Sequence, residues 1–150
     1  MTPQETAEKC AAIMWLDDHA ARGLGMAIVA VGPGSATLHM PIRQDMVNGH
    51  GTCHGAFIFA VADATFGYAC NSDNHRAVAG GVDINFLAPA FLGDVLTAVG
   101  KQRQQGGRSG IYDIEVANQD GKLVALFRGR SVRIKGHFFD PAAVSAAVTG

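Results

Sequence analysis

The sequence has few cysteines, no long apolar run and no N-terminal targeting pattern. Its cysteines are Cys10, Cys53 and Cys70, an odd number without CxxC spacing, which argues against a disulfide framework and favours a reducing compartment. The longest apolar stretch, residues 56–70, is interrupted by Asp63 and is shorter than the ~20 residues that cross a bilayer. The polar first residues do not resemble a signal peptide. We therefore expect a soluble, cytoplasmic protein that has no membrane partner.

Charge of one sign is also scarce. The net charge is −1, and no cluster of Lys and Arg or acidic tail is present, so nucleic acid is not an expected partner. A small anionic ligand is not excluded as a partner, because binding it needs only a few cations. The 150 residues, 48% of them apolar, suit one domain with a hydrophobic core. We expect a single domain over residues 1–150, with a core of about 10–135 and a loose C-terminal tail of about 136–150.

The order of elements follows from periodicity and turn signals. Thr2, Pro3 and Glu5 mark a helix start, and this first helix is expected to end at Gly23 and Gly25. A Gly-Pro-Gly hairpin at 32–34 joins two short runs. Residues 56–70 form a helix that is apolar on every side and must be buried.

The second half of the chain reads as extended runs separated by turns. These runs cover residues 77–88, 94–105, 109–117 and 123–134. One apolar helix can be covered on all sides only if a sheet curves around it. The predicted fold is therefore α+β, a long central helix wrapped by a curved antiparallel sheet.

Asp63 is the one charged residue in the apolar helix, and its helical neighbours carry no charge. Burying an unpaired carboxylate is unfavourable, so it must be protonated, paired or facing a wet cleft. One interpretation is structural, a carboxylate that caps a loop or pairs with an arginine. The other is catalytic, a general base or nucleophile held on a rigid helix.

The polar, glycine-rich loop of residues 43–55 leads into this helix and ends with His54 and Gly55. Backbone N–H groups at a helix N-terminus stabilise negative charge, which suits an oxyanion hole. The alternative is that His54 only caps the helix and Gly55 eases the turn. A Cys53–His54 nucleophile pair is weakly indicated, and so is a metal site of His50, Cys53 and His54, because no second ligand cluster exists. We expect no metal.

A third feature is a glycine pair between cations at a strand junction. Its residues are Arg103, Gly106, Gly107, Arg108 and Ser109. It is either a phosphate site or a solvated hairpin tip. A solvated sheet face is the favoured interpretation for the alternating Arg128, Arg130 and Arg133, and Asp83 and Asn85 are expected as polar strand positions.

The order and spacing of these segments, over about residues 10–135, resemble those of hot-dog fold acyl-CoA thioesterases of the phenylacetic-acid-degradation (PaaI) type. The segments that carry the resemblance are Asn48-Gly49-His50, Cys53-His54-Gly55, Ala62-Asp63, Phe66-Gly67-Tyr68-Ala69-Cys70-Asn71, the run 81–89, Tyr112-Asp113-Ile114-Glu115 and Ala125-Leu126-Phe127-Arg128-Gly129. One position departs from the pattern. Some relatives have Ser or Thr where this chain has Gly81, so the way the attacking water is oriented stays open.

The resemblance implies an acyl-CoA thioesterase that acts on an arylacetyl-CoA such as phenylacetyl-CoA or a hydroxylated derivative. The enzyme would be a dimer or a dimer of dimers, with no cofactor beyond the CoA of the substrate. Gly55 of one subunit would polarise the thioester carbonyl, and Asp63 of the facing subunit would act as base or nucleophile. Asn48 would position water or the acyl group, and His54 would hold the loop.

The resemblance also places the CoA phosphates at basic residues of the cleft mouth. Arg108, with Ser109 and Gly107, is the expected site. Two alternatives stay open. A hot-dog hydratase or dehydratase would need a histidine beside the reacting carbon. A non-catalytic acyl-CoA-binding module would not need a carboxylate inside an apolar helix.

Overall fold

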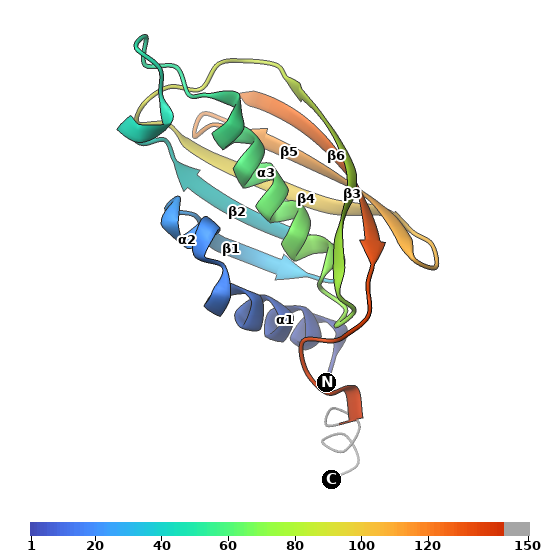
Figure 1. Cartoon of the computed structure of the whole chain (residues 1–150). Coiled ribbons are helices and arrows are strands. Elements are labelled where there is room, and N and C mark those ends of the chain that lie inside the picture. The colour runs from blue at the N-terminus through green and yellow to red at the C-terminus, as the bar shows by residue number, and fades with distance from the viewer. Residues whose placement is uncertain (143–150) are drawn as a thin grey trace.

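The computed structural model describes residues 1–142. In chain order its elements are α1 (Pro3–Asp17), α2 (His19–Gly23), β1 (Ala27–Gly32), β2 (Ser35–Pro41), the 3-10 turn η1 (Gln44–Met46), α3 (Gly55–Cys70), β3 (Ala77–Phe86), β4 (Val95–Gln105), β5 (Ser109–Ala117) and β6 (Leu123–Arg133). The strands form one sheet in the order β1-β2-β4-β5-β6-β3, antiparallel throughout. The sheet curves around α3 (Figure 1). The predicted hot-dog fold is confirmed.

The core lies between α3 and the concave face of the sheet, and α3 packs against all six strands. Ile58, Val61 and Phe66 point into it and are almost fully buried, whereas Phe57 is only partly buried. The Phe66 ring is wedged over Gly129 of β6. A Cβ on that glycine would lie 2.7 Å from the ring, so packing requires the glycine.

The first helical region differs from the prediction, because it is two helices that meet at Asp18 rather than one that ends at Gly23 and Gly25. The predicted start is confirmed, since Thr2 and Glu5 form a capping box. Asp18 leaves the helical conformation and accepts hydrogen bonds from the Ala21 N–H at 3.0 Å and the Tyr68 hydroxyl at 2.8 Å. The long-range bond to Tyr68 of α3 cannot be read from helical spacing.

The start of the C-terminal tail, residues 136–142, contacts the loop after α3. Asn74, a buried residue with φ of 66°, accepts hydrogen bonds from the Phe138 and Phe139 N–H groups and donates one to the Phe139 carbonyl. Lys9 and Arg76 lie over the Phe139 and Phe138 rings. These contacts fix the first part of a segment expected to be loose, and its remainder, 143–150, lies outside the described residues.

The β3 edge of the sheet exposes apolar side chains. At the β3 edge, several large apolar side chains are 41–52% exposed: Val78, Val82, Phe86 and the following Leu87. An edge strand that exposes both apolar side chains and backbone groups is a template for pairing with another chain.

No helix of the described residues is long and apolar enough to span a bilayer.

Candidate active site

Asp63 lies midway along α3, partly exposed, in the wall of a cavity of about 290 Å³ between α3 and the α1–α2 region. Burial raises the pKa of its carboxyl group. Among the described residues it has no hydrogen-bond donor or cationic partner, so neither the capping nor the arginine-pairing interpretation applies within this part of the chain. A carboxylate with a raised pKa and no partner is suited to accept a proton.

Gly55 is the first residue of α3, so its N–H has no partner within the helix. The N–H groups before it are engaged, Cys53 with the Ala90 carbonyl and His54 with the Met46 carbonyl. The Phe86 ring lies against Gly55, and a Cβ there would be 3.0 Å from the ring's Cζ. This N–H has no hydrogen-bond partner among residues 1–142 and lies at the positive end of a 16-residue helix, where negative charge is stabilised.

Asn48 and His54 shape the loop that holds Gly55. The Asn48 side-chain oxygen accepts hydrogen bonds from the His50 and Thr52 N–H groups, at 2.9 and 3.1 Å. Its amide N–H₂ is the part left to face a ligand. His54 is exposed and does not cap α3 with its side chain, and its backbone N–H donates to the Met46 carbonyl at 2.9 Å.

Gly55 and Asp63 face different hollows of one chain. Gly55 lines a second hollow of about 550 Å³ together with Phe86 and Leu87. Eight residues along an α-helix correspond to about 12 Å, so the two groups of one chain cannot both reach a single carbonyl.

Arg108, Ser109 and Gly107 lie at the tip of the β4–β5 hairpin, and this tip is at the opposite end of the sheet from Gly55 (Figure 1). The loop before α3 is joined to the start of β4 by the bond from the Ile42 N–H to the Asp94 carbonyl. Strands rise about 3.3 Å per residue, so β4 separates the two ends by about 30 Å. One chain therefore does not bring the expected phosphate site to the expected oxyanion site.

The cysteine and metal alternatives find no support. Cys53 is buried, and its burial raises the thiol pKa to about 11, so the nucleophilic thiolate is scarce at neutral pH. Within residues 1–142, no group of three or more His, Cys, Asp and Glu side chains is placed to bind a metal.

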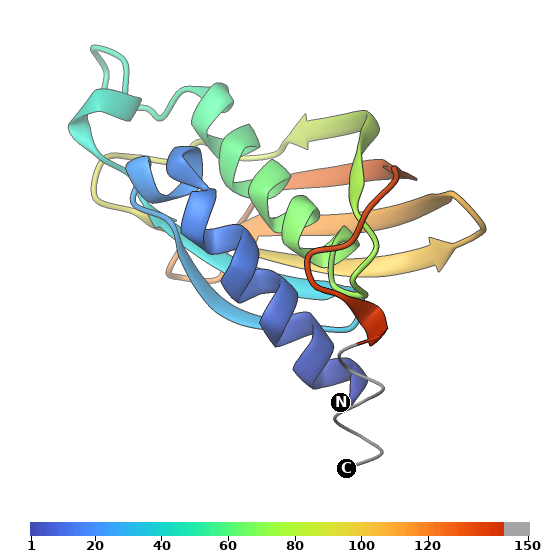
Figure 2. The ribbon, with the colours of Figure 1, turned by 60° about the horizontal axis from the view of Figure 1, so that its bottom comes forward.

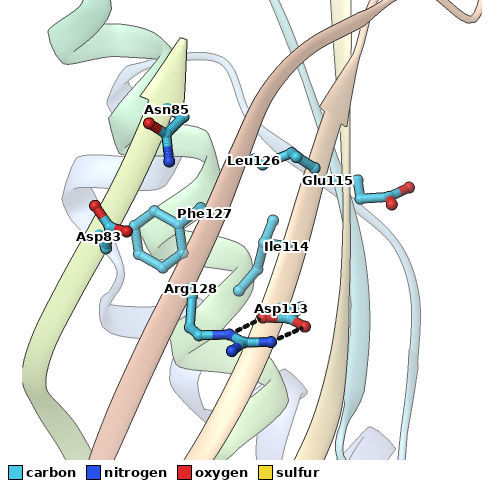
Figure 3. Close-up of a pocket in the computed structure, with 8 residues that line it drawn as sticks. All are labelled: Asp83, Asn85, Asp113, Ile114, Glu115, Leu126, Phe127 and Arg128. Carbon is cyan, nitrogen blue, oxygen red and sulfur yellow. Dashed lines mark hydrogen bonds and ion pairs between the residues drawn. The ribbon is translucent and has the colours of Figure 1, made fainter. Parts of the chain in front are cut away.

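A further hollow of about 430 Å³ lies on the sheet face opposite α3, lined by residues of β3, β5 and β6 (Figure 3). Two of its charged side chains, Asp113 and Arg128, pair across strands, whereas Asp83 and Glu115 have no partner among the ion pairs of residues 1–142. Arg128 donates to both Asp113 oxygens, at 2.6 and 2.8 Å, and this holds the Asp113 pKa below its usual value. Asp83 and Asn85 are exposed on β3, as predicted. This face fits the predicted solvated surface.

The sequence analysis did not predict that Asp18 and Tyr68 lie near Asp63. They lie fifty positions apart and line the same cavity. The only local signal was that an aspartate is suited to cap a new helix, and the hydrogen bond between them depends on the tertiary fold.

Fold and site together define a hot-dog hydrolase. A long helix inside a curved antiparallel sheet carries the partly buried Asp63 carboxylate and begins at Gly55. Known proteins of similar sequence and structure identify the family.

The sequence matches the thioesterase superfamily over residues 50–125. It is 48% identical over 123 residues to the acyl-coenzyme A thioesterase PaaI of Escherichia coli, covering 82% of this chain and 88% of that protein. The solved E. coli PaaI structure, from the phenylacetic acid degradation operon, superposes with a TM-score of 0.89 at 45% identity, covering 91% of this chain and 99% of that one.

A protein of Streptococcus mutans bound to acetyl-CoA superposes with a TM-score of 0.72 at 25% identity, over 75% of this chain and 90% of that one. The chain belongs to the thioesterase superfamily, and its predicted class, a thioester hydrolase, is confirmed.

Proposed function

We propose that this protein hydrolyses acyl-CoA thioesters, with arylacetyl-CoA such as phenylacetyl-CoA or a hydroxylated derivative as its substrate class. The observation that carries the proposal is the partly buried carboxylate of Asp63, which has no partner within residues 1–142, on the helix that begins with the Gly55 N–H. Its similarity to the E. coli enzyme, an acyl-CoA thioesterase of 48% identity, supports the substrate class.

In the proposed reaction the Gly55 N–H donates a hydrogen bond to the thioester oxygen and stabilises the negative charge that forms there. Asp63 takes a proton from the attacking water, or attacks the carbonyl carbon itself before water releases the acyl group. The C–S bond breaks, and the products are a carboxylic acid and the thiol of CoA. The Asn48 amide orients water or the acyl group. No electrons are transferred, so the reaction needs no redox cofactor.

The site forms between two copies that pair along their β3 edges. Antiparallel pairing about a two-fold axis places the Ala77 end of one β3 beside the Phe86 end of the other. Phe86 packs on Gly55. The Ala77 end adjoins the hairpin tip, because Ala77 pairs with Arg133 and the Arg133 N–H donates to the Arg108 carbonyl.

This arrangement brings Arg108 of one copy toward Gly55 of the other, where a CoA phosphate would bind with Ser109 and Gly107. It also sets the two α3 helices side by side, so that Asp63 of one copy can face Gly55 of the other. Assembly of two such dimers into a tetramer, and the cytoplasmic location, stay predictions.

The direct test is the rate of CoA thiol release from phenylacetyl-CoA. Asp63→Asn should lower kcat by about 10³ or more, the contribution of a general base or nucleophile. Asp17→Asn, an exposed aspartate at the end of α1, is the matched control and should leave the rate unchanged. If Asp63→Asn kept more than about a tenth of the wild-type rate, Asp63 would have no part in the reaction.

A further inference from the structure

The cavity that Asp63 lines, called the chamber here, is enclosed by apolar side chains from two sides. Met14, Leu24 and Met26 contribute from the α1–β1 side, and Ala60, Ala64 and Gly67 from α3, which lies beside α1 on the same side of the sheet (Figure 2). Tyr68 also lines it. Asp63 and Tyr68 are five positions apart, about 7.5 Å along the helix, so the chamber extends away from the proposed reacting carboxylate.

Gly67 is a glycine that packing within the described residues does not require. It lies inside α3, where glycine is less favourable than alanine. A Cβ at Gly67 would meet no atom within 4 Å, unlike the Cβ at Gly129 beside Phe66. A helix position left open toward a cavity, next to a carboxylate, provides room for a ligand.

The far end of the chamber carries an uncompensated negative charge. The Tyr68 hydroxyl donates to Asp18 Oδ2 at 2.8 Å, and Asp18 Oδ1 accepts from the Ala21 N–H at 3.0 Å. No cation pairs with Asp18 among the ion pairs of residues 1–142. Arg76 lines an adjoining hollow together with Asp18, but its guanidinium is engaged with the Phe138 ring and the His137 carbonyl.

We propose that the chamber holds the acyl group of the substrate, and that Asp18 restricts the enzyme to acyl groups whose far end is uncharged. The inference rests on the proposed function, since it places the acyl carbon at Asp63. A carboxylate at the end of the acyl group would lie between Asp18 and Asp63 in a partly desolvated space, where like charges repel strongly. A neutral aryl or alkyl end would meet only the apolar walls.

The test compares phenylacetyl-CoA with (4-carboxyphenyl)acetyl-CoA on the full-length protein. The wild type should have a kcat/KM at least about 10-fold lower for the charged substrate. Asp18→Asn should raise kcat/KM for that substrate about 10-fold and leave the neutral one nearly unchanged. Asparagine still caps α2 through its amide oxygen, and its amide N–H₂, in place of Oδ2, can donate to the Tyr68 hydroxyl oxygen. Asp17→Asn makes the same charge change outside the chamber and should keep the wild-type ratio.

A second variant tests the position of the acyl group. Gly67→Leu should fill the chamber and lower kcat/KM for phenylacetyl-CoA about 10-fold or more, while acetyl-CoA, whose acyl group does not reach Gly67, should be hydrolysed as by the wild type. An equal loss on both substrates would place the acyl group elsewhere.

The outcomes separate this inference from the proposed function. If thioesters are hydrolysed but Asp18→Asn keeps the wild-type ratio, the inference is overturned and the function stands. If no thioester is hydrolysed, the function is wrong, and calorimetric binding of the corresponding non-hydrolysable thioethers decides the inference. If the wild type discriminates against the charged ligand and Asp18→Asn removes that discrimination, the inference is supported. If the discrimination is absent, the inference is overturned.

Discussion

Replacing Gly55 with proline would remove one N–H from the proposed oxyanion site while α3 can still form. Gly55 is the first residue of the helix, where proline is well tolerated. His54 has the extended conformation (φ −61°, ψ 138°) that a residue before proline prefers. Loss of one oxyanion donor typically lowers kcat by about 10²–10³, or about 2.7–4 kcal/mol, and we expect a loss in this range for phenylacetyl-CoA.

The matched control is Gly55→Ala, which adds a Cβ at the same place but keeps the N–H. That Cβ would lie 3.0 Å from Phe86 Cζ, and the Phe86 side chain, 52% exposed, has room to move. Gly55→Ala should therefore stay within about tenfold of the wild-type kcat. Thiol release at saturating substrate, with helicity checked by circular dichroism, measures both. Equal losses in the two variants would mean that steric fit, not the N–H, explains the effect.

Three further predictions concern the Asp63 carboxylate, the Arg108 guanidinium and bound metal ions. Because burial raises the Asp63 pKa, the folded protein binds this proton more tightly than the unfolded chain does. The contribution of the Asp63 carboxyl group to stability is therefore full below the unfolded pKa, and it falls as pH rises through the folded pKa. Asp63→Asn should thus raise Tm at pH 7, by roughly 2–4 °C for each 1 kcal/mol of stability gained, and the gain should vanish in acid. A Tm that is lower at pH 7 would contradict this. Arg108→Ala should raise KM for acyl-CoA with kcat nearly unchanged, and a thioester without the nucleotide should be unaffected; an equal effect on both substrates would assign Arg108 a structural role. Dialysis against EDTA should leave the hydrolysis rate unchanged. If EDTA lowered the rate and zinc restored it, His50, Cys53 and His54 would be metal ligands.

The parts of the fold that could be predicted from sequence are those set by local pattern. The continuous apolar surface of 56–70 and the period of two in β5 already indicate a helix wrapped by a sheet, and Asp63 stands out because a charge there has no local partner. The break at Asp18 could not be predicted, because its cause is a hydrogen bond to Tyr68 fifty positions away. For the same reason the chamber between α1–α2 and α3 has no sequence signature.

The candidate site was predictable in its residues but not in its geometry. Motif spacing singles out Gly55, Asp63 and Arg108, and eight helical residues already imply about 12 Å between Gly55 and Asp63. Only the three-dimensional structure places Arg108 at the opposite end of the sheet from Gly55. Spacing along a chain says which groups share an element. It does not say which copy of the chain supplies each group to one site.

Complementation between two inactive variants tests the shared site most directly. Asp63→Asn and Gly55→Pro chains, carrying different affinity tags, would be co-expressed and the hybrid dimer purified through both tags. If Gly55 and Asp63 act from different copies, the hybrid has one intact site and should recover about half of the wild-type rate per dimer, while each parent variant stays inactive. A hybrid no more active than its parents would show that the two groups do not act across the interface.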